Sequence, residues 1–323
     1  MIKSNRRSLI SDQWMAEMPP ATDVNWLWHG ILAPGCITLL TSQWKTGKST
    51  LLAILLATMQ SGQPLAGLAV RPGIGFVVSE EPKVLWRQRI QKFGLRKHLM
   101  LRRPFSGVPD REQWQQLLDH IADMHAKHNL SLLAIDPLVM FFPSHSESDA
   151  SGAAQALAEL RSLADRGMAV LVLHHPKKGD TKEGQAARGI GVLNAEVDII
   201  LEMTNFSSPA TDDRRRRIVA FSRFEETPRR LLLELNHDGT DYNVLPPHAA
   251  NPHDLTLLDL IRSSDRPATA ASLQKAWPDE HTRPDLTTIR RWLGTLVEQE
   301  LIVQVGSGKK NDPFRYVVEK GAD

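Results

Sequence analysis

The sequence predicts an α/β protein built on a mostly parallel β-sheet, with helices on both faces and a small, mainly helical domain at the C-terminal end. Two observations support this prediction. Apolar segments of strand length alternate with helical segments along residues 31–245, and the middle strands are continuously apolar. Continuous apolar strands separated by helices are typical of a parallel sheet that is buried on both faces.

The predicted elements follow a regular order. We expect strands at 36–41, 75–79, 130–136 and 168–175, and helices at 49–60, 83–93, 111–128 and 153–167. Three further strands, at 196–203, 216–223 and 231–236, follow one another without long helices. This pattern indicates antiparallel additions at one edge of the sheet. Residues 1–30 are expected to form an N-terminal arm, and residues 31–245 the core.

The pattern changes after a linker at 246–253 that is rich in Pro, Ala and His. Three helices are predicted at 254–264, 268–277 and 285–300, and two strands around a Gly/Lys-rich turn within 301–318. Three helices followed by a hairpin match a winged helix-turn-helix domain, which we expect over residues 254–323.

The composition limits the class of protein. Hydrophobic residues make up 41% and charged residues 24%, which is ordinary for a soluble globular protein. The formal net charge of +2 argues neither for nor against a nucleic-acid partner. The single cysteine, Cys36, excludes an internal disulfide. No apolar run approaches the roughly 20 residues that span a bilayer. We therefore expect a cytoplasmic protein with no membrane partner.

Residues 42–49 read SQWKTGKS, which fits the phosphate-binding turn G-x4-G-K-[ST] except that Ser42 replaces the first glycine. The turn lies between a predicted strand and a predicted helix, as this motif requires. Its backbone N–H groups would converge on phosphates, Lys48 would neutralise them, and the Ser49 hydroxyl would coordinate Mg²⁺. The sequence therefore predicts an ATP and Mg²⁺ site whose nucleotide-binding residues are Ser42, Gln43, Trp44, Lys45, Thr46, Gly47, Lys48, Ser49 and Thr50.

Acidic residues follow two of the predicted strands. Asp136 ends the strand LLAID, where a carboxylate would hold Mg²⁺ together with Ser49; a simple turn cap before Pro137 is the alternative. No second acid follows Asp136, so a base for the attacking water must come from elsewhere. Since the carboxyl ends of parallel strands meet at one edge, Glu80 in VVSEEP is our candidate, with Glu81 in support. A purely structural acid pair is the alternative.

Two histidines, His174 and His175, end the fourth strand of the core. We expect His175 to sense the γ-phosphate and His174 to turn into the protein. The segment 176–191 that follows is polar and slightly basic, and it is either a solvated loop or a nucleic-acid contact. Its candidate nucleic-acid residues are Lys177, Lys178, Lys182 and Arg188.

Arginines near the end of the core suggest two different roles. We interpret the run Arg214–Arg217 as the solvated edge of a hairpin. Arg223 is either a surface residue or an arginine finger that a neighbouring subunit receives. In the C-terminal domain, Arg290 and Arg291 fall on the outer side of the third helix, where a recognition helix would meet DNA. The many acids of this domain leave a protein partner open.

The motif order SQWKTGKST, FVVSEEP, LLAIDPL, VLHHPKKG, ARGIGVL and FSRFEETP resembles the RecA-like ATPases of the RepA type, a group of hexameric plasmid replicative helicases. The resemblance covers about residues 25–240. It implies a RecA-like core that assembles as a ring with ATP between subunits. Within the matching motifs, the phosphate and Mg²⁺ ligands, catalytic glutamate, Walker B acid, sensor and arginine finger would be Lys48, Ser49, Glu80, Asp136, His175 and Arg223. Ser42 and the winged-helix tail depart from the plasmid helicases.

Three functional hypotheses follow. The first is an oligomeric, Mg²⁺-dependent ATPase, expected as a homohexamer, which acts in a helicase-like way on DNA, single-stranded at the core and duplex at the winged helix. The second is a DNA-binding regulator or adaptor whose assembly is switched by ATP. The third is a small-molecule kinase, which lacks support because no lid-like arginine cluster with an acceptor site is found.

Overall fold

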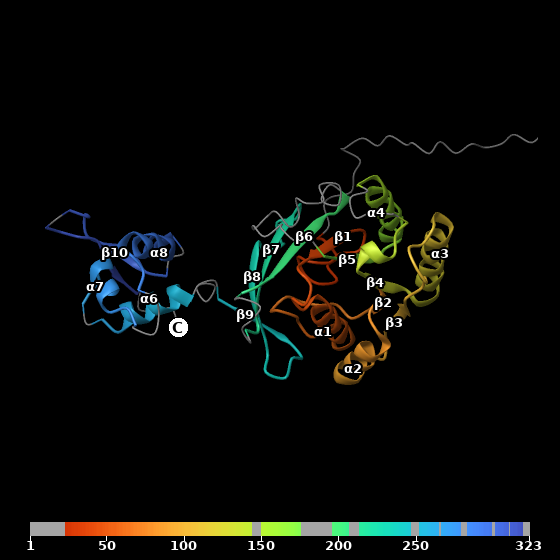
Figure 1. Cartoon of the computed structure of the whole chain (residues 1–323), viewed down its shortest axis with the longest axis horizontal. Helices are drawn as coiled ribbons and strands as arrows, with labels where there is room; N and C mark the ends of the chain where they lie inside the picture. The colour runs from red at the N-terminus through yellow and green to blue at the C-terminus, as the bar shows by residue number, and fades with distance from the viewer. Residues whose placement is uncertain are drawn as a thin grey trace, which may run out of the picture.

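The computed structural model describes residues 23–143, 150–175, 196–206, 213–246, 252–264, 266–278, 283–298, 301–309 and 311–318. Within these residues, nine strands form one sheet and two more form a small sheet near the C-terminal end. Helices flank the large sheet on both sides (Figure 1). The predicted α/β class with a mostly parallel sheet is confirmed.

The large sheet has the strand order β3-β2-β4-β5-β1-β6-β7-β8-β9. Its strands are β1 Ile37–Thr41, β2 Ile74–Ser79, β3 Leu99–Arg102, β4 Leu130–Asp136, β5 Ala169–His174, β6 Ile199–Asn205, β7 Arg215–Ser222, β8 Arg230–Leu235 and β9 Tyr242–Leu245. All pairings from β3 to β6 are parallel, and those from β6 to β9 are antiparallel.

The structure corrects one expectation about this edge. The strand predicted at 196–203 is β6, and it pairs in parallel with β1 rather than forming the first antiparallel addition. Residues 175–198 separate β5 from β6, which is long enough for the crossover that a parallel strand requires. Among the described strands, only β7, β8 and β9 extend the sheet in antiparallel fashion.

Within the described part of the chain, the helices that pack on the large sheet are α1 Lys48–Ser61, α2 Lys83–Phe93, α3 Arg111–His128 and α4 Ala150–Ala164. A short 3₁₀ turn, η2 Leu138–Met140, follows β4. Helix α3 is capped at its N-terminus by Asp110, which forms a reciprocal capping box with Gln113. Gly62 caps the C-terminus of α1: it has a left-handed conformation, and its N–H donates to the Thr58 carbonyl.

The two faces of the sheet bury two separate hydrophobic clusters. Leu40, Val77 and Leu132 pack in the cluster that contains α1, and Leu39 and Val78 pack in the cluster that contains α3 and α4. Successive strand residues point to opposite faces, so burial of both faces explains why these strands are continuously apolar. Part of the segment expected as an arm belongs to the α1 cluster, where its buried residues are Trp26, Leu27 and Trp28.

The C-terminal elements form a separate group with a core of their own (Figure 1, blue). They are α6 Pro252–Arg262, α7 Ala270–Lys275, α8 Leu286–Glu298, β10 Val303–Val305 and β11 Arg315–Val317. Helix α8 buries Ile289 and Leu293 and exposes Arg290 and Arg291. Three helices and a hairpin agree with the predicted elements, and the winged-helix assignment stays a prediction.

A bilayer-spanning segment is not found in the described residues, since none of their helices combines sufficient length with sufficient apolarity.

Candidate functional site

The predicted site residues meet at the carboxyl edge of the parallel strands. β2, β4, β5 and β1 lie side by side and end together, because Ser79 pairs with Asp136 and Thr41 pairs with His174. A cavity of about 320 Å³ opens at this edge. It is lined by Lys45, Gly47, Lys48, Ser49, Thr50, Glu80, Glu81, Arg89, Asp136 and His175.

The phosphate-binding turn holds its lysine inside the protein. The Lys48 ammonium, which is buried, donates to the Ser42 carbonyl and hydroxyl oxygens, both at 2.9 Å, and to the Gln43 carbonyl at 3.3 Å. It also lies 3.0 Å from Nδ1 of His175. Burial lowers the pKa of Lys48 to about 8, and the charge of Asp136 opposes this shift. Phosphate oxygens in the cavity would favour the charged lysine.

The geometry accounts for Ser42, the irregular residue of the motif. Among the described non-glycine residues with positive φ are Lys45 and Arg103, but not Ser42. The backbone at this position therefore accepts a Cβ without left-handed strain. The Ser42 hydroxyl donates to the Gln43 carbonyl at 2.9 Å and accepts from Lys48. A glycine at position 42 would lack the hydroxyl that accepts this hydrogen bond from Lys48.

The residues predicted to hold Mg²⁺ are in direct contact. The Ser49 hydroxyl donates to Oδ2 of Asp136 at 2.8 Å, and Asp136 is only 4% exposed. Burial raises the pKa of Asp136 to about 6, and the Ser49 hydrogen bond opposes this shift. The described residues contain no cluster of three or more His, Cys, Asp or Glu side chains suited to a metal. One carboxylate and one hydroxyl are enough for a Mg²⁺ ion that takes its remaining ligands from substrate phosphates and water.

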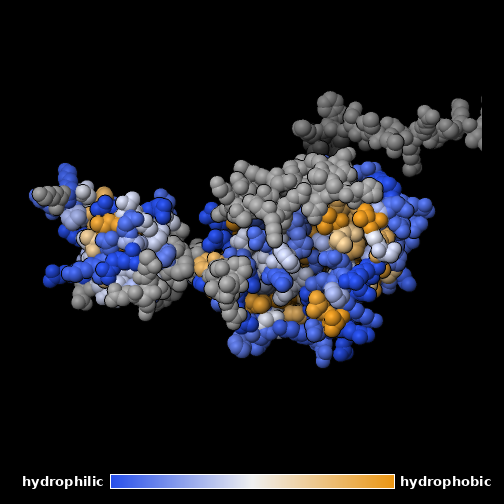
Figure 2. Space-filling view, in the orientation of Figure 1, coloured by the Kyte–Doolittle hydropathy of each residue, from blue (hydrophilic) through white to orange (hydrophobic). Residues whose placement is uncertain are grey.

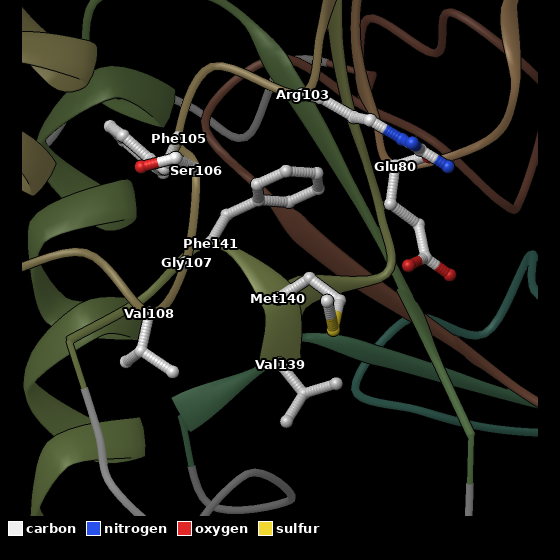
Figure 3. A pocket seen from close by; sticks show the side chains of 9 residues that line it. All are labelled: Glu80, Arg103, Phe105, Ser106, Gly107, Val108, Val139, Met140 and Phe141. Carbon is white, nitrogen blue, oxygen red and sulfur yellow. The ribbon is translucent and has the colours of Figure 1, made fainter.

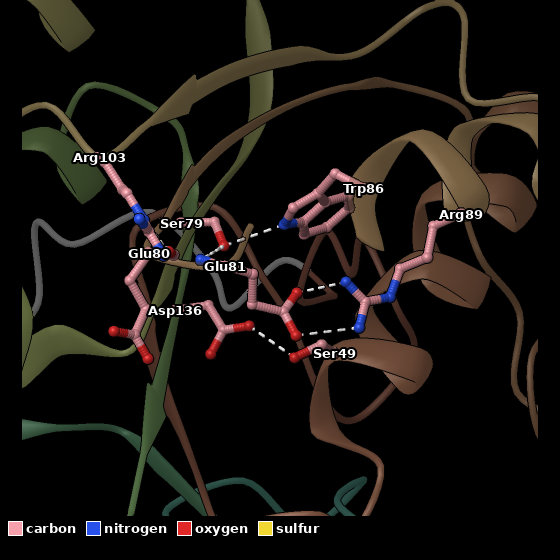
Figure 4. Close-up of polar contacts among 8 residues, drawn as sticks. All are labelled: Ser49, Ser79, Glu80, Glu81, Trp86, Arg89, Arg103 and Asp136. Carbon is pink, nitrogen blue, oxygen red and sulfur yellow. Dashed lines mark hydrogen bonds and ion pairs between the residues drawn. The ribbon is translucent and has the colours of Figure 1, made fainter. Parts of the chain in front are cut away.

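The structure distinguishes the two adjacent acids that follow β2 (Figure 4). Glu81 forms a bidentate ion pair with Arg89, whose guanidinium lies 5.0 Å from the Trp86 ring centre. Trp86 in turn donates to the Ser79 hydroxyl at 3.0 Å. In the described part of the chain, the carboxylate of Glu80 has no hydrogen-bond or ion-pair partner. Glu80 is therefore the acid that is free to accept a proton in this cavity.

The backbone of Glu80 is fixed although its carboxylate is free. Its N–H donates to the Asp136 carbonyl at 3.1 Å, and its carbonyl accepts from Nε of Arg103 at 2.6 Å. Glu80 also borders a second cavity of about 450 Å³ (Figure 3), lined otherwise by Arg103, Phe105, Ser106, Gly107, Val108, Val139, Met140 and Phe141. Figure 2 shows hydrophobic surface near the place that α4 takes in Figure 1. Glu80 thus lies between the polar cavity that contains Lys48 and this second, mainly apolar cavity.

The two histidines at the end of β5 point in different directions. The ring of His174 is buried and its Nδ1 lies 3.2 Å from the Thr41 hydroxyl. Burial lowers the pKa of His174 to about 4, with further lowering from His175 and Lys48. His175 is half-buried and lines the cavity beside Lys48, and burial also lowers its pKa. These positions agree with the expected orientations, and the sensor role of His175 stays a prediction.

Comparison with known proteins identifies the family. Residues 4–181, more than half of the chain, match the family model described as an AAA domain. This chain belongs to the AAA domain family. The match contains the phosphate-binding turn, Glu80, Asp136 and His175. A search of curated proteins gave no match. The AAA domain supports a P-loop ATPase in general, with nucleotide binding and usually a divalent metal.

The predicted arginine finger, Arg223, lies away from this cavity. Arg223 follows β7 at the opposite edge of the sheet, where its side chain is 68% exposed and lies 3.7 Å from Asp198. β1 spans five residues, so the two edges are roughly 15 Å apart. Within one chain, Arg223 does not reach the cavity. Lys177, Lys178, Lys182 and Arg188 lie outside the described residues.

One residue that contacts the phosphate-binding turn was missed in the sequence. The run Arg214–Arg217 is not simply a solvated edge, because Nε of Arg216 donates to the Thr46 carbonyl in the phosphate-binding turn at 2.7 Å. The prediction was wrong at this residue because the sequence does not show which face of the strand meets the phosphate-binding turn. Strand alternation alone would have separated Arg215 and Arg217 from Arg216.

Proposed function

We propose that this chain is an oligomeric, Mg²⁺-dependent ATPase that couples ATP hydrolysis to DNA binding or translocation in a helicase-like way. The observation that carries the ATPase part is the convergence of Lys48, the Ser49–Asp136 pair and the unpaired Glu80 on one cavity. Such a set supplies a phosphate ligand, a metal site and a base at one sheet edge.

In the proposed reaction, Glu80 orients a water molecule and accepts its proton as the water oxygen bonds to the γ-phosphorus. The bond between that phosphorus and the bridging oxygen of ADP breaks, which releases ADP and phosphate. Lys48 exchanges its contacts with Ser42 and Gln43 for phosphate oxygens. Ser49 and Asp136 would hold Mg²⁺, which would supply positive charge to the phosphate oxygens. Glu81 is less suited as the base because Arg89 already binds its carboxylate.

The oligomeric part of the proposal rests on the resemblance to RepA-type ATPases and on the position of Arg223. Its exposed side chain is far from the cavity of its own chain and accessible to a neighbour. We propose that Arg223 completes the site of the next subunit in a ring, expected to be a hexamer, and stabilises the charge that develops on the transferred phosphoryl group.

The DNA part rests on two basic regions. The segment with Lys177, Lys178, Lys182 and Arg188 directly follows His175 in the sequence, so a change at His175 on loss of the γ-phosphate would pass to it. We propose that it contacts single-stranded DNA. The exposed Arg290 and Arg291 on α8 would meet a duplex if the C-terminal group acts as a winged helix.

A second candidate function is an ATP-switched, DNA-binding regulator or adaptor without helicase activity. It is favoured by the C-terminal group, which has a hydrophobic core of its own and a basic exposed face on α8. In that case ATP would control assembly, and the helix would recognise a specific site or a protein partner.

One experiment separates the two candidates. ATP hydrolysis is measured with and without single-stranded DNA, and the mass of the ATP-bound assembly is determined in parallel. The motor predicts a faster rate, a change in assembly, or both, when single-stranded DNA is added. If single-stranded DNA alters neither property while ATP is hydrolysed, the regulator is the better assignment.

A further inference from the structure

The antiparallel part of the sheet touches the phosphate-binding turn at one charged residue. Arg216 of β7 donates from Nε to the Thr46 carbonyl at 2.7 Å. Its Nη1 donates to the Asp213 and Arg215 carbonyls, both at 2.8 Å. These contacts anchor the guanidinium on its own strand and join that strand to residues far away in the sequence.

The contact with Thr46 bears on the next residue of the turn. The peptide bond between Thr46 and Gly47 is planar, so its carbonyl and its N–H point in opposite directions. A donor that holds the Thr46 carbonyl outward therefore holds the Gly47 N–H inward. Backbone N–H groups of this turn are the ones that bind phosphate oxygens. Arg216 thus fixes the direction of a group that would bind the nucleotide.

Gly47 is enclosed from the same side. Its φ of +107° lies in the left-handed region, which glycine adopts readily. A Cβ at this position would lie 3.4 Å from the Tyr242 hydroxyl, 3.8 Å from Cε of Met203 and 3.9 Å from Nε of Arg216. Strands β6, β7 and β9 therefore each place one side chain against the turn.

The neighbouring arginines do not share this position. Arg215 and Arg217 lie 4.0 and 5.5 Å from the ring centre of Phe206, on the other face of β7. Arg214 donates to the His237 carbonyl. Among the described hydrogen bonds of the run Arg214–Arg217, the one to the phosphate-binding turn comes from Arg216.

We propose that Arg216 is a positioning residue for nucleoside triphosphate binding, through which β7–β9 help to set the phosphate-binding turn. The proposal rests on the proposed ATPase function and deepens it. When the guanidinium is removed, the free turn can leave this orientation and nucleotide binding must restore it, which corresponds to about a tenfold loss of affinity. Nucleotide affinity should therefore fall when the guanidinium is removed, and KM should change more than kcat.

The test uses the full chain and a fluorescent ATP analogue with Mg²⁺. Arg216→Met keeps the apolar stem without a donor, Arg216→Lys keeps the charge and one donor, and Arg217→Met is the matched control on the other face of β7. The expected dissociation constants are raised about tenfold for R216M, about threefold for R216K and not at all for R217M. Melting temperatures without nucleotide show whether each variant is folded.

Several outcomes would overturn the inference. Unchanged affinity in a folded R216M, or equal weakening in R216M and R217M, removes the special position of Arg216. If R216M does not fold, R216K decides the test. Unchanged nucleotide affinity in R216K would then overturn the inference, and weaker binding by R216K at an unchanged melting temperature would support it. Failure of the wild-type chain to bind the analogue refutes the proposed function instead, which keeps the two results distinguishable.

Discussion

The buried histidine at the end of β5 gives a prediction about stability and pH. Burial lowers the pKa of His174 to about 4, whereas an unfolded histidine titrates near 6.5. The folded state therefore favours the neutral ring. Above pH 6.5 the ring is mainly neutral in the unfolded chain as well, so His174 does not lower the free energy of unfolding there. As pH falls towards about 4, the unfolded chain binds a proton that the folded chain excludes. At pH 5 this difference lowers the free energy of unfolding by about 2 kcal/mol relative to pH 7.5.

The matched variant is His174→Asn, which offers Thr41 an amide near the position of Nδ1. The free energy of unfolding is measured by urea titration with far-UV circular dichroism, at pH 7.5 and pH 5, for both proteins. The wild type should lose about 2 kcal/mol more than H174N between the two pH values. Other groups, including Asp136 with its raised pKa, are common to both proteins and cancel in the comparison. Equal losses in the two proteins would refute the reasoning.

Three further predictions concern the nucleotide site. Glu80→Gln should keep ATP affinity and lower kcat by about 10²- to 10⁴-fold, and Glu81→Gln should lower kcat less; the opposite order in steady-state assays would reverse their roles. Ser42→Ala should tighten nucleotide binding by about fivefold, because Lys48 then has no Ser42 hydroxyl contact to give up when it moves to the phosphate oxygens. Weaker binding in a fluorescence titration would contradict this. Asp136→Asn should raise the Mg²⁺ concentration required for half-maximal hydrolysis, and an unchanged requirement would exclude Asp136 as a ligand.

Much of the site could be predicted because it depends on strand ends. Glu80, Asp136 and His175 each follow a continuous apolar run, and parallel strands bring such positions to one edge. The phosphate-binding turn can be recognised in the sequence from Gly47, Lys48 and the helical pattern that follows. These features are local in sequence, so the sequence alone was sufficient for them.

Other features depend on contacts between distant segments. The strands β3 and β9 have four residues each and no distinctive pattern, so they were not predicted. The pairing of Glu81 with Arg89 separates it from Glu80, although both acids look alike in the sequence. Arg216 differs from its neighbours only because the alternation of β7 turns it towards Thr46. Such distinctions arise from register and side-chain direction, which a single sequence specifies weakly.

The central claim is that residues 42–49 and Glu80 form an ATP-hydrolysing site, and phosphate release tests it most directly. The rate of phosphate release from ATP and Mg²⁺ is measured for the wild-type chain and for Lys48→Ala, with folding of both checked by circular dichroism. The account predicts steady release by the wild type and release no faster than background by K48A. Full activity in a folded K48A protein would contradict it.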